Sequence, residues 1–265
     1  MNEQERLAYL KALGIQTWQQ RSNAAPVSFD AESVNQPAKQ MDPELLDPAD
    51  VTDTQAQAMN GTTGLNTSGA AREVNLLPWD VIQEQVSGCT LCDLHQSRTQ
   101  TVFGTGTTDT SLMIIGEAPG ADEDKTGQPF VGRAGKLLDL MLKAVGFNRD
   151  SVFIANVLKC RPPNNRDPHP DEVEQCLPYL QQQIAHVNPD VILAVGKIAA
   201  HNLIGGKETI GKMRNQIHGV DNELLGRSIP MVVTYHPAYL LRRASEKHKS
   251  WEDLKLTMSV LKQTQ

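Results

Sequence analysis

The sequence predicts an α/β fold of three layers, with a central four-stranded parallel sheet between two layers of helices, preceded by a disordered N-terminal extension. Two observations support this prediction. From residue 77 onward, short apolar runs alternate with helical patterns, the order that builds a parallel sheet covered on both faces. Residues 24–72, by contrast, are rich in small polar residues and proline and show no sustained hydrophobic period, which is typical of a flexible tether.

Four apolar runs are the expected strands, and a helical pattern follows each of them. The strands are SLMIIG (111–116), VFIANVLKC (152–160), DVILAVG (190–196) and MVVTYHP (231–237). The helices are KLLDLMLKAVG (136–146), PDEVEQCLPYLQQQIAHV (170–187), KIAAHNLI (197–204) and SWEDLKLTMSVLKQ (250–263). Sheets of this kind bind their ligands beyond the carboxyl ends of the strands, so we expect the site in the segments that follow the four strands.

The chain of 265 residues is long enough for one sizeable core and additional chain. We expect a short amphipathic helix at 1–22 that docks on a partner, a flexible acidic linker at 23–76, and one folded domain at 77–265. Residues 1–76 carry ten acids and five bases, whereas the remainder carries 21 acids and 20 bases. The total charge therefore gives no sign of nucleic-acid binding, which would need a local basic surface.

The N-terminal stretch MNEQERLAYLKALGI lacks the basic start and unbroken apolar core of a signal peptide. The sequence also contains no run of about 18 apolar residues, the length of a membrane span. We therefore expect a soluble cytoplasmic protein without a membrane partner, and we expect it to be a monomer. In a reducing compartment, cysteines more commonly act as thiolate ligands than as disulfides.

The segment GEAPGADEDKTGQPFVGRAG (116–135) has five glycines and two prolines, as a phosphate-binding loop does. It has no GxxxxGK[ST] pattern, however, and its carboxylates would repel a phosphate. These carboxylates are Glu117, Asp122, Glu123 and Asp124. The glycines more plausibly let the backbone approach a flat ligand, and the acids suit a water, an amide-like edge or a developing positive charge, as in glycoside cleavage. Capping of a helix N-terminus is the structural alternative for one or two of the acids.

The four cysteines of the chain form a possible ligand set, with Cys89 and Cys92 in a CxxC pair followed by Cys160 and Cys176. Four thiolates suit either Zn²⁺ or a [4Fe–4S] cluster. Fifteen residues separate the last two cysteines, and this spacing mildly disfavours zinc, which usually takes its second pair at close spacing. Buried cysteines without a metal remain the structural alternative.

These segments together resemble the family 4 uracil-DNA glycosylases, the iron–sulfur branch of that superfamily. The segment GEAPGADEDKTGQPFVGRAGKLLD resembles the first motif of the family, NVLKCRPPNNRDP the second and HPAYLLR the third, and all four cysteines match its cluster pattern. The resemblance covers about residues 77 to 264. It implies a [4Fe–4S] cluster held by the four cysteines, and an enzyme of base excision repair that removes uracil from single- or double-stranded DNA and leaves an abasic site.

The resemblance also implies roles for individual residues in an enzyme that takes the target base out of the stack. Phe130 would stack on the base, Asn156 would pair with its O4 and N3–H, and His236 would stabilise the negative charge of the leaving uracil through O2. The structural alternatives are core packing for the phenylalanine, a satisfied turn position for the asparagine, and a structural histidine.

Several carboxylates compete for the task of holding the attacking water. Glu117 would touch the base or position water, and we prefer Glu123 to Asp124 as the residue that holds water and stabilises the sugar cation. Ala118 would lie in the base pocket, at the position where glycosylases of the best-known first family have a water-activating Asp. No insertion follows the second motif and His169 lies near the last cysteine, so we expect turnover rather than a covalent protein–DNA adduct.

The third motif and its neighbours supply the expected DNA contacts. Leu240 and Leu241 resemble a wedge that fills the vacated stack. Basic residues would hold phosphates, and this binding would weaken with salt. They are Arg242, Arg243, Arg161, Arg166, Lys247 and Lys249. The structural alternative is the first turn of a helix with an exposed basic face.

The N-terminal segment RLAYLKALGIQTWQQR resembles the start of the psi subunit of the bacterial DNA polymerase III clamp loader. A short apolar helix on a long tether suits docking into a groove of a partner, so the hypothesis is that clamp-loader subunits bind residues 1–22. Two other classes of function remain open: a non-catalytic DNA or clamp-loader accessory protein on the same fold, and a DNA-binding module built on a Cys₄ zinc site.

Overall fold

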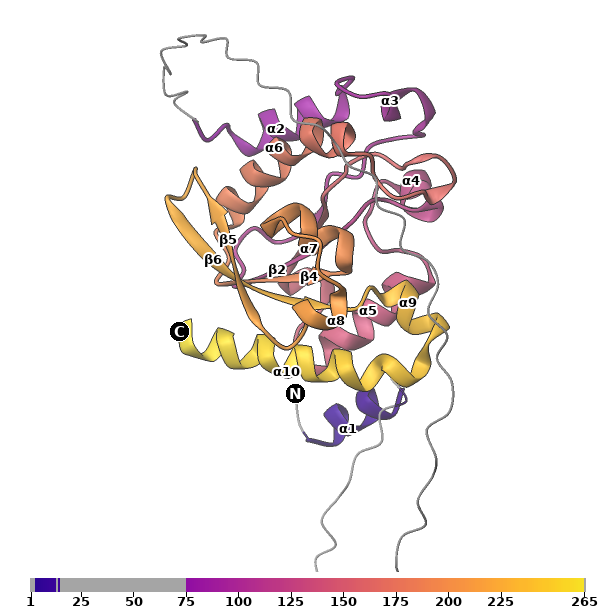
Figure 1. The fold of residues 1–265 in the computed structure, drawn as a ribbon, viewed down its shortest axis with the longest axis vertical. Coiled ribbons are helices and arrows are strands. Elements are labelled where there is room, and N and C mark those ends of the chain that lie inside the picture. The colour runs from indigo at the N-terminus through magenta and orange to yellow at the C-terminus, as the bar shows by residue number, and fades with distance from the viewer. Residues whose placement is uncertain (1–2, 13, 15–74, 265) are drawn as a thin grey trace, which may run out of the picture. The chain divides into compact units, whose positions relative to one another are not determined.

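A six-stranded mixed sheet organises the part of the chain that the computed structural model describes, residues 3–12, 14 and 75–264 (Figure 1). The strand order is β1-β3-β2-β4-β6-β5. The four central strands run parallel: β3 (Phe153–Asn156), β2 (Leu112–Gly116), β4 (Val191–Val195) and β6 (Arg227–Thr234). They are the four strands that the apolar runs predicted, so the parallel core of the sheet is confirmed.

Two antiparallel edge strands enlarge the predicted four-stranded sheet to six strands. They are β1 (Thr105–Gly106), which pairs with β3, and β5 (Ile217–Asn222), which pairs with β6. The prediction missed β1 because two residues carry no periodic signal. It missed β5 because the sequence IHGVDN has little apolar content, as suits an edge strand with one face in solvent.

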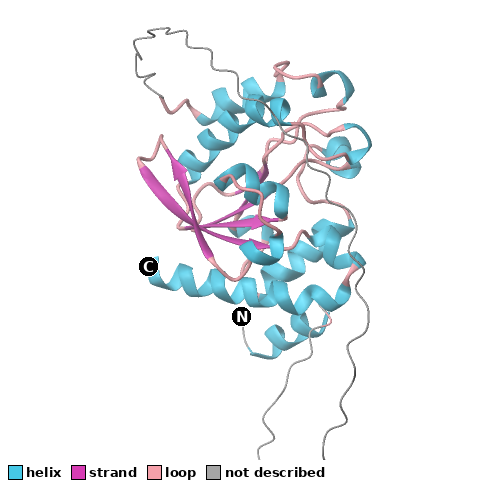
Figure 2. Cartoon of the chain, in the orientation of Figure 1, coloured by secondary structure: helices cyan, strands magenta, loops and turns pink. Residues whose placement is uncertain are grey.

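Helices cover both faces of the sheet, so the three-layer prediction is also correct (Figure 2). One face packs against α6 (Pro170–Val187) and α7 (Lys197–Ile204), and the other packs against α5 (Arg133–Ala144) and α10 (Lys247–Thr264). Alternation along each strand separates the two cores: Met113 and Ile115 of β2 face α6, whereas Leu112 and Ile114 face α5.

Shorter helices lie between the main elements, in segments where the sequence analysis assigned no separate helix. They are α2 (Trp79–Ser87), α3 (Leu94–Ser97), α4 (Ala121–Thr126), α8 (Ile210–Met213) and α9 (Pro237–Arg242), with 3₁₀ turns at Arg149–Ser151, Pro163–Asn165 and Ala244–Glu246. Two of them, α4 and α9, begin directly after motif residues at the carboxyl ends of the strands. In the described ranges, none of the helices combines the length and the apolar character that crossing a bilayer needs.

Helix α1 (Glu3–Ala12) forms inside the segment predicted to dock on a partner. Its Leu10 is only 2% exposed and belongs to the apolar cluster on the α5 side of the sheet. The rest of that segment beyond residue 14, and nearly all of the predicted linker at 23–76, lie outside the described residues. The predictions made for them therefore stay predictions.

Candidate active site

An open cavity of about 450 Å³ lies where the predicted motif segments meet beyond the carboxyl ends of β2, β3 and β6. It brings together eight of the residues that the sequence singled out. They are Glu117, Ala118, Glu123, Phe130, Asn156, Arg166, His236 and Arg242. Residues separated by more than a hundred positions in the chain therefore share one site, as the position of ligand sites in parallel sheets requires.

Asn156 ends strand β3 at the wall of this cavity and is 2% exposed. Its Oδ1 is buried and accepts no hydrogen bond from any residue that the structure describes. An unsatisfied buried acceptor costs about 1–3 kcal/mol, and such groups in native proteins call for an explanation. A ligand that donates a hydrogen bond to Oδ1 would explain why this acceptor is left unpaired.

Gly116 pairs with Asn156 across the β2–β3 ladder and leaves the space that two pocket side chains occupy. A Cβ at Gly116 would lie 2.4 Å from Oδ1 of Asn156 and 2.6 Å from Cζ of Phe130. The sequence analysis expected the glycines of this loop to admit a ligand. It did not find that Gly116 makes room for the side chains of Asn156 and Phe130, which requires knowing the register of β2 against β3.

Phe130 packs at the edge of the cavity in a conformation that few residues adopt. Its φ is +54°, although it is not a glycine, and its side chain is 6% exposed. Gly135 permits this turn, because a Cβ there would lie 1.7 Å from the carbonyl oxygen of Phe130. The Phe130 ring lies 5.6 Å from the His236 ring, with 31° between the planes. Strained backbone of this kind concentrates at functional sites, and here it places an aromatic face on the cavity.

His236 precedes the first residue of α9 and has one ring nitrogen committed to the backbone. Its Nδ1 accepts a hydrogen bond from the Ala238 N–H at 3.1 Å, so Nδ1 is unprotonated and the proton of the neutral ring is on Nε2. Desolvation lowers the pKa of His236 to about 4, and the charge of Arg242 contributes, against an opposing effect of Glu123. At neutral pH the ring is therefore an uncharged donor through Nε2.

Glu123, which we predicted to hold the attacking water, organises the loop through backbone hydrogen bonds. One carboxylate oxygen accepts from the Gly120 N–H at 3.1 Å, and the other accepts from the Val131 and Gly132 N–H groups at 3.0 and 3.4 Å. The first bond caps helix α4, the alternative that the sequence analysis had kept for these acids. The second oxygen ties α4 to the turn after Phe130. Glu123 lines the cavity, but its carboxylate is committed to three backbone donors.

Asp124 is likewise structural, because it is 4% exposed and accepts a hydrogen bond from the Thr99 N–H at 2.9 Å. The carboxyl group left on the cavity wall in the first motif is that of Glu117. Burial, with a smaller contribution from the charge of Asp167, raises the pKa of Glu117 to about 7. Asp167 also lines the cavity, and the sequence analysis missed it because it gave no role to the acid of NNRDP.

The two leucines of the third motif have opposite environments. Leu240 is 1% exposed and packs in the core on the α5 side, whereas Leu241 is 38% exposed. The phase of helix α9 against the domain sets this difference. Leu240 is therefore a core residue rather than part of a wedge, and the wedge prediction is kept for Leu241 alone.

The basic residues differ in whether their side chains are held by bonds to other residues. Arg242 lines the cavity and Arg243 is exposed at the end of α9. Arg161 donates to Oδ1 of Asn165 at 2.8 Å. Arg166 lines the cavity but forms two hydrogen bonds with the Glu172 carboxylate, at 2.9 and 2.5 Å. Its position by the site is therefore fixed by that ion pair.

The two lysines expected to extend the basic strip lie near the start of α10. Lys247 is the first residue of that helix and is partly buried. Lys249 forms an ion pair with Glu246 at 2.8 Å. This pair is exposed to solvent and contributes little to stability.

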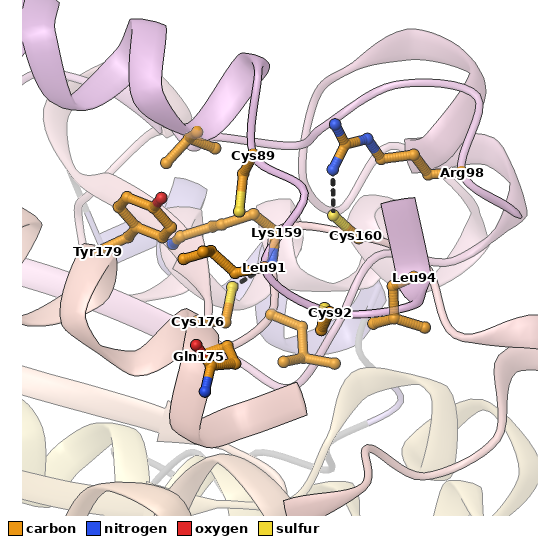
Figure 3. A pocket seen from close by; sticks show the side chains of 12 residues that line it. Cys89, Leu91, Cys92, Leu94, Arg98, Lys159, Cys160, Gln175, Cys176 and Tyr179 are labelled. Atoms are coloured by element: carbon orange, nitrogen blue, oxygen red, sulfur yellow. Dashed lines mark hydrogen bonds between the residues drawn. The ribbon is translucent and has the colours of Figure 1, made fainter. Parts of the chain in front are cut away.

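A second, more enclosed pocket contains all four cysteines (Figure 3). Cys89 and Cys92 come from the loop between α2 and α3, Cys160 follows strand β3, and Cys176 lies on α6. None of them forms a disulfide. The four predicted ligands therefore share one pocket, but among the described residues no three Cys, His, Asp or Glu groups are arranged to hold a single metal ion, so the ligand set stays a prediction.

N–H groups donate hydrogen bonds to two of the sulfur atoms in this pocket. Arg98 donates to Sγ of Cys160 at 3.1 Å, and the Lys159 N–H donates to Sγ of Cys176 at 3.2 Å (Figure 3). Burial raises the pKa of Cys176 to about 12 and lowers that of Lys159 to about 8. Four cysteines in one pocket, two of them with N–H donors to their sulfurs, fit a thiolate-ligated centre, since N–H···S bonds stabilise ionised thiolates and metal binding removes the thiol protons.

Comparison with known proteins identifies the family. The model of the uracil DNA glycosylase superfamily matches residues 103–255. The type-4 uracil-DNA glycosylase of Thermotoga maritima is 44% identical over 186 residues, 69% of this chain and 94% of that protein. The type-4 enzyme of Archaeoglobus fulgidus is 42% identical over 180 residues, 66% of this chain and 89% of that protein. The type-5 enzyme of Pyrobaculum aerophilum is 32% identical over 109 residues, 36% of this chain and 48% of that protein. The chain therefore belongs to the uracil DNA glycosylase superfamily and, within it, to the type-4 uracil-DNA glycosylases.

Proposed function

We propose that the protein hydrolyses the N-glycosidic bond between uracil and deoxyribose in DNA and releases the free base, leaving an abasic site. The observation that carries this proposal is the orphaned Oδ1 of Asn156 in a cavity that Phe130 and His236 also line. The names of the type-4 relatives agree with it. The substrate is a nucleotide extruded from the DNA stack, because the glycosidic bond must reach this recessed site.

Asn156 is proposed to read the edge of the base. Its Oδ1 accepts from N3–H of uracil and its Nδ2 donates to O4, while the Phe130 ring stacks on the base. Cytosine presents an acceptor at N3 and an amine at C4, so both contacts become repulsive. A buried amide that rejects a mismatched partner discriminates strongly because its polar groups are then left unpaired.

His236 is proposed to stabilise the leaving group. As the bond between C1′ and N1 breaks, its electron pair passes to uracil, and the negative charge reaches O2. The Nε2–H of His236 donates to that oxygen, and the Ala238 N–H keeps the proton on this nitrogen. Removing one such donor typically costs 10²- to 10³-fold in rate. Because the donor is neutral, the site also avoids the free-energy cost of burying a charged imidazolium.

Water completes the reaction by adding its oxygen to C1′ of the sugar cation and losing one proton. With Glu123 committed to the loop, Glu117 is the acid of the first motif that we propose positions this water and accepts the proton. Asp167 lies close enough to influence Glu117 electrostatically, and it adds negative charge on the same side of the cavity. Both carboxylates would stabilise the developing positive charge of the sugar.

The four cysteines would hold a [4Fe–4S] cluster, whose chemistry here is to tie the α2–α3 loop, the end of β3 and helix α6 together. The N–H donors to Cys160 and Cys176 support this assignment. A Cys₄ zinc centre is the alternative, and colour with iron analysis of the purified protein separates the two, because an iron–sulfur protein is brown. DNA phosphates would be held near Arg242 and Arg243 at the mouth of the cavity.

Docking of residues 1–22 on clamp-loader subunits is a separate hypothesis that rests on the resemblance of that segment, since Leu10 of helix α1 is buried against this domain. It has its own test: recovery of clamp-loader subunits with the purified protein should vanish when residues 1–22 are deleted. Unchanged recovery would end the hypothesis without affecting the enzyme assignment. We also propose that the protein is cytoplasmic and that it is a monomer. Light scattering of the full chain tests the monomeric state.

The experiment for the enzyme assignment uses an oligonucleotide with one uracil, in single- and double-stranded form, followed by alkali to cleave abasic sites. Uracil-dependent cleavage that collapses in His236→Ala supports the proposal and locates one catalytic residue. A cluster-loaded protein that yields no cleavage on either strand form would favour the non-catalytic accessory protein instead.

A further inference from the structure

Lys159 lies between the two sites of this protein, three residues after Asn156 and directly before Cys160. It is 1% exposed and its side chain lines the cysteine pocket (Figure 3). Lysines are almost never fully buried unless they are paired. Neither the reading of uracil nor the ligand set uses this ammonium group, so its burial needs another reason.

The ammonium group of Lys159 holds the backbone of the uracil-reading residue. Its Nζ donates to the carbonyl oxygen of Asn156 at 2.8 Å and to Oε1 of Gln183 on α6 at 2.6 Å. Gln183 is itself fully buried and donates through Nε2 to the carbonyl of Phe103 at 2.9 Å. The Asn156 carbonyl is thus the first member of a buried chain of hydrogen bonds.

Among the described residues, no N–H group of a loop or turn donates to the Asn156 carbonyl, and the sheet explains why. On the β2 side, pairing continues past the end of β3, because the Val157 and Leu158 N–H groups donate to the carbonyls of Gly116 and Glu117. On the opposite side, β1 pairs only as far as residues 153 and 154 of β3. The Lys159 ammonium therefore takes the place of a neighbouring strand at the point where the sheet ends.

The charge of Lys159 has no carboxylate partner among the residues that the structure describes. A buried ammonium without an anion is costly. Its side chain lines the same pocket as Cys160 and Cys176. As metal ligands those cysteines would be anionic, because a thiol must lose its proton to bind a metal. The ligand set would then supply the negative charge that this lysine lacks elsewhere.

We propose that Lys159 is a positioning residue for uracil recognition, holding the end of β3 and the Asn156 amide in place, with its charge balanced by the metal-bound cysteines. The inference rests on the proposed function. It gives the cysteine centre a defined connection to the base pocket through one side chain. Loss of the centre would then weaken uracil recognition even while the sheet stays folded.

The test compares Lys159→Met with Lys143→Met, a matched change at an exposed position of α5. Three quantities are measured on each protein: iron content, affinity for free uracil by calorimetry, and the single-turnover rate on uracil-containing DNA per iron-loaded chain. Lys159→Met should lower the affinity and the rate roughly 10- to 100-fold, the effect of losing one hydrogen bond from a charged donor. Lys143→Met should match the wild type, and Lys159→Arg, which keeps the cation, should lie closer to wild type than Lys159→Met.

Two results would overturn the proposal. One is a Lys159→Met protein with full iron, wild-type uracil affinity and wild-type rate. The other is a protein that loads less iron but retains wild-type affinity and rate per loaded chain, because Lys159 would then serve the metal centre alone. If Lys159→Met does not fold, Gln183→Met replaces it: a lower uracil affinity supports the chain of hydrogen bonds and an unchanged one refutes it. A wild-type protein that releases no uracil refutes the proposed function itself, before any variant is compared.

Discussion

Gly116→Ala provides a sharp test of the geometry of the base pocket. The added Cβ would lie 2.4 Å from Oδ1 of Asn156 and 2.6 Å from Cζ of Phe130, both well inside the contact distances that real side chains show. Both neighbours are buried and both are proposed to touch uracil. One methyl group should therefore displace the residue that reads the base, the residue that stacks on it, or both.

The magnitude follows from the cost of overpacking, about 1–3 kcal/mol for an inserted methylene. If the pocket absorbs this strain by moving Asn156 or Phe130, uracil release should slow roughly 5- to 150-fold, since each 1.4 kcal/mol is a factor of ten. If the fold absorbs it, the melting temperature should fall by about 2–12 °C, at about 2–4 °C per kcal/mol for a domain of this size. That loss is smaller than the usual stability of a domain, so the variant should remain folded.

The assay is single-turnover release of uracil from an oligonucleotide, with thermal melting of the same samples. Gly211→Ala is the control, because a Cβ there meets only Oγ1 of Thr209 at 4.0 Å and φ is ordinary. The control should leave both rate and melting temperature near wild type. A Gly116→Ala enzyme that releases uracil at the wild-type rate would show that the pocket does not depend on this close approach, and would refute the reasoning.

Three further predictions concern recognition, pH dependence and DNA contacts. Asn156→Asp should lose uracil release by at least 100-fold in the alkali assay, because a carboxylate offers no donor to O4; full activity would remove Asn156 from the site. Because the pKa of Glu117 is raised from 4.5 to about 7, the unfolded chain loses this proton first, so stability should fall as the pH rises from about 4.5 to 7. Glu117→Gln should flatten that slope in melting curves, and identical slopes in the two proteins would contradict the assignment. Leu241→Ala should slow uracil release from duplex DNA more than release from single strands, with little change in melting temperature. Leu240→Ala should instead lower the stability by about 2–5 kcal/mol. The reverse pattern would restore Leu240 as the wedge.

The central sheet was predictable because its strands are buried on both faces and read as continuous apolar runs. All five residues of β2 and all five of β4 are buried, so neither needed tertiary information to be found. Strand β5 depends on pairing with β6 for its existence, and its polar sequence carries no such signal. The prediction missed β5 because the strand forms through pairing with a distant segment, and no local pattern in the sequence indicates that pairing.

The location of the candidate site was predictable because the carboxyl ends of parallel strands must meet, and the resemblance of the motifs there supplied the individual residues. The roles of the neighbouring acids could not be predicted from the sequence. Whether Glu117 or Glu123 faces the cavity with a free carboxylate depends on where the backbone N–H groups of Val131 and Gly132 lie, eight and nine residues further along. The same holds for Leu240 and Leu241, whose environments are decided by the rotation of α9 against the domain.

Helix α9 has a consequence for how the protein measures its substrate. The helix is six residues long, about 9 Å at 1.5 Å per residue. Its N-terminal cap is His236, which we propose donates to the leaving base, and its last residues are Leu241 and Arg242, which we propose contact DNA. The length of the helix therefore fixes the distance between the proposed DNA contacts and the proposed catalytic ring. Inserting one residue would turn the far end by about 100° relative to the near end, so Leu241 and Arg242 would lose their present orientation relative to His236.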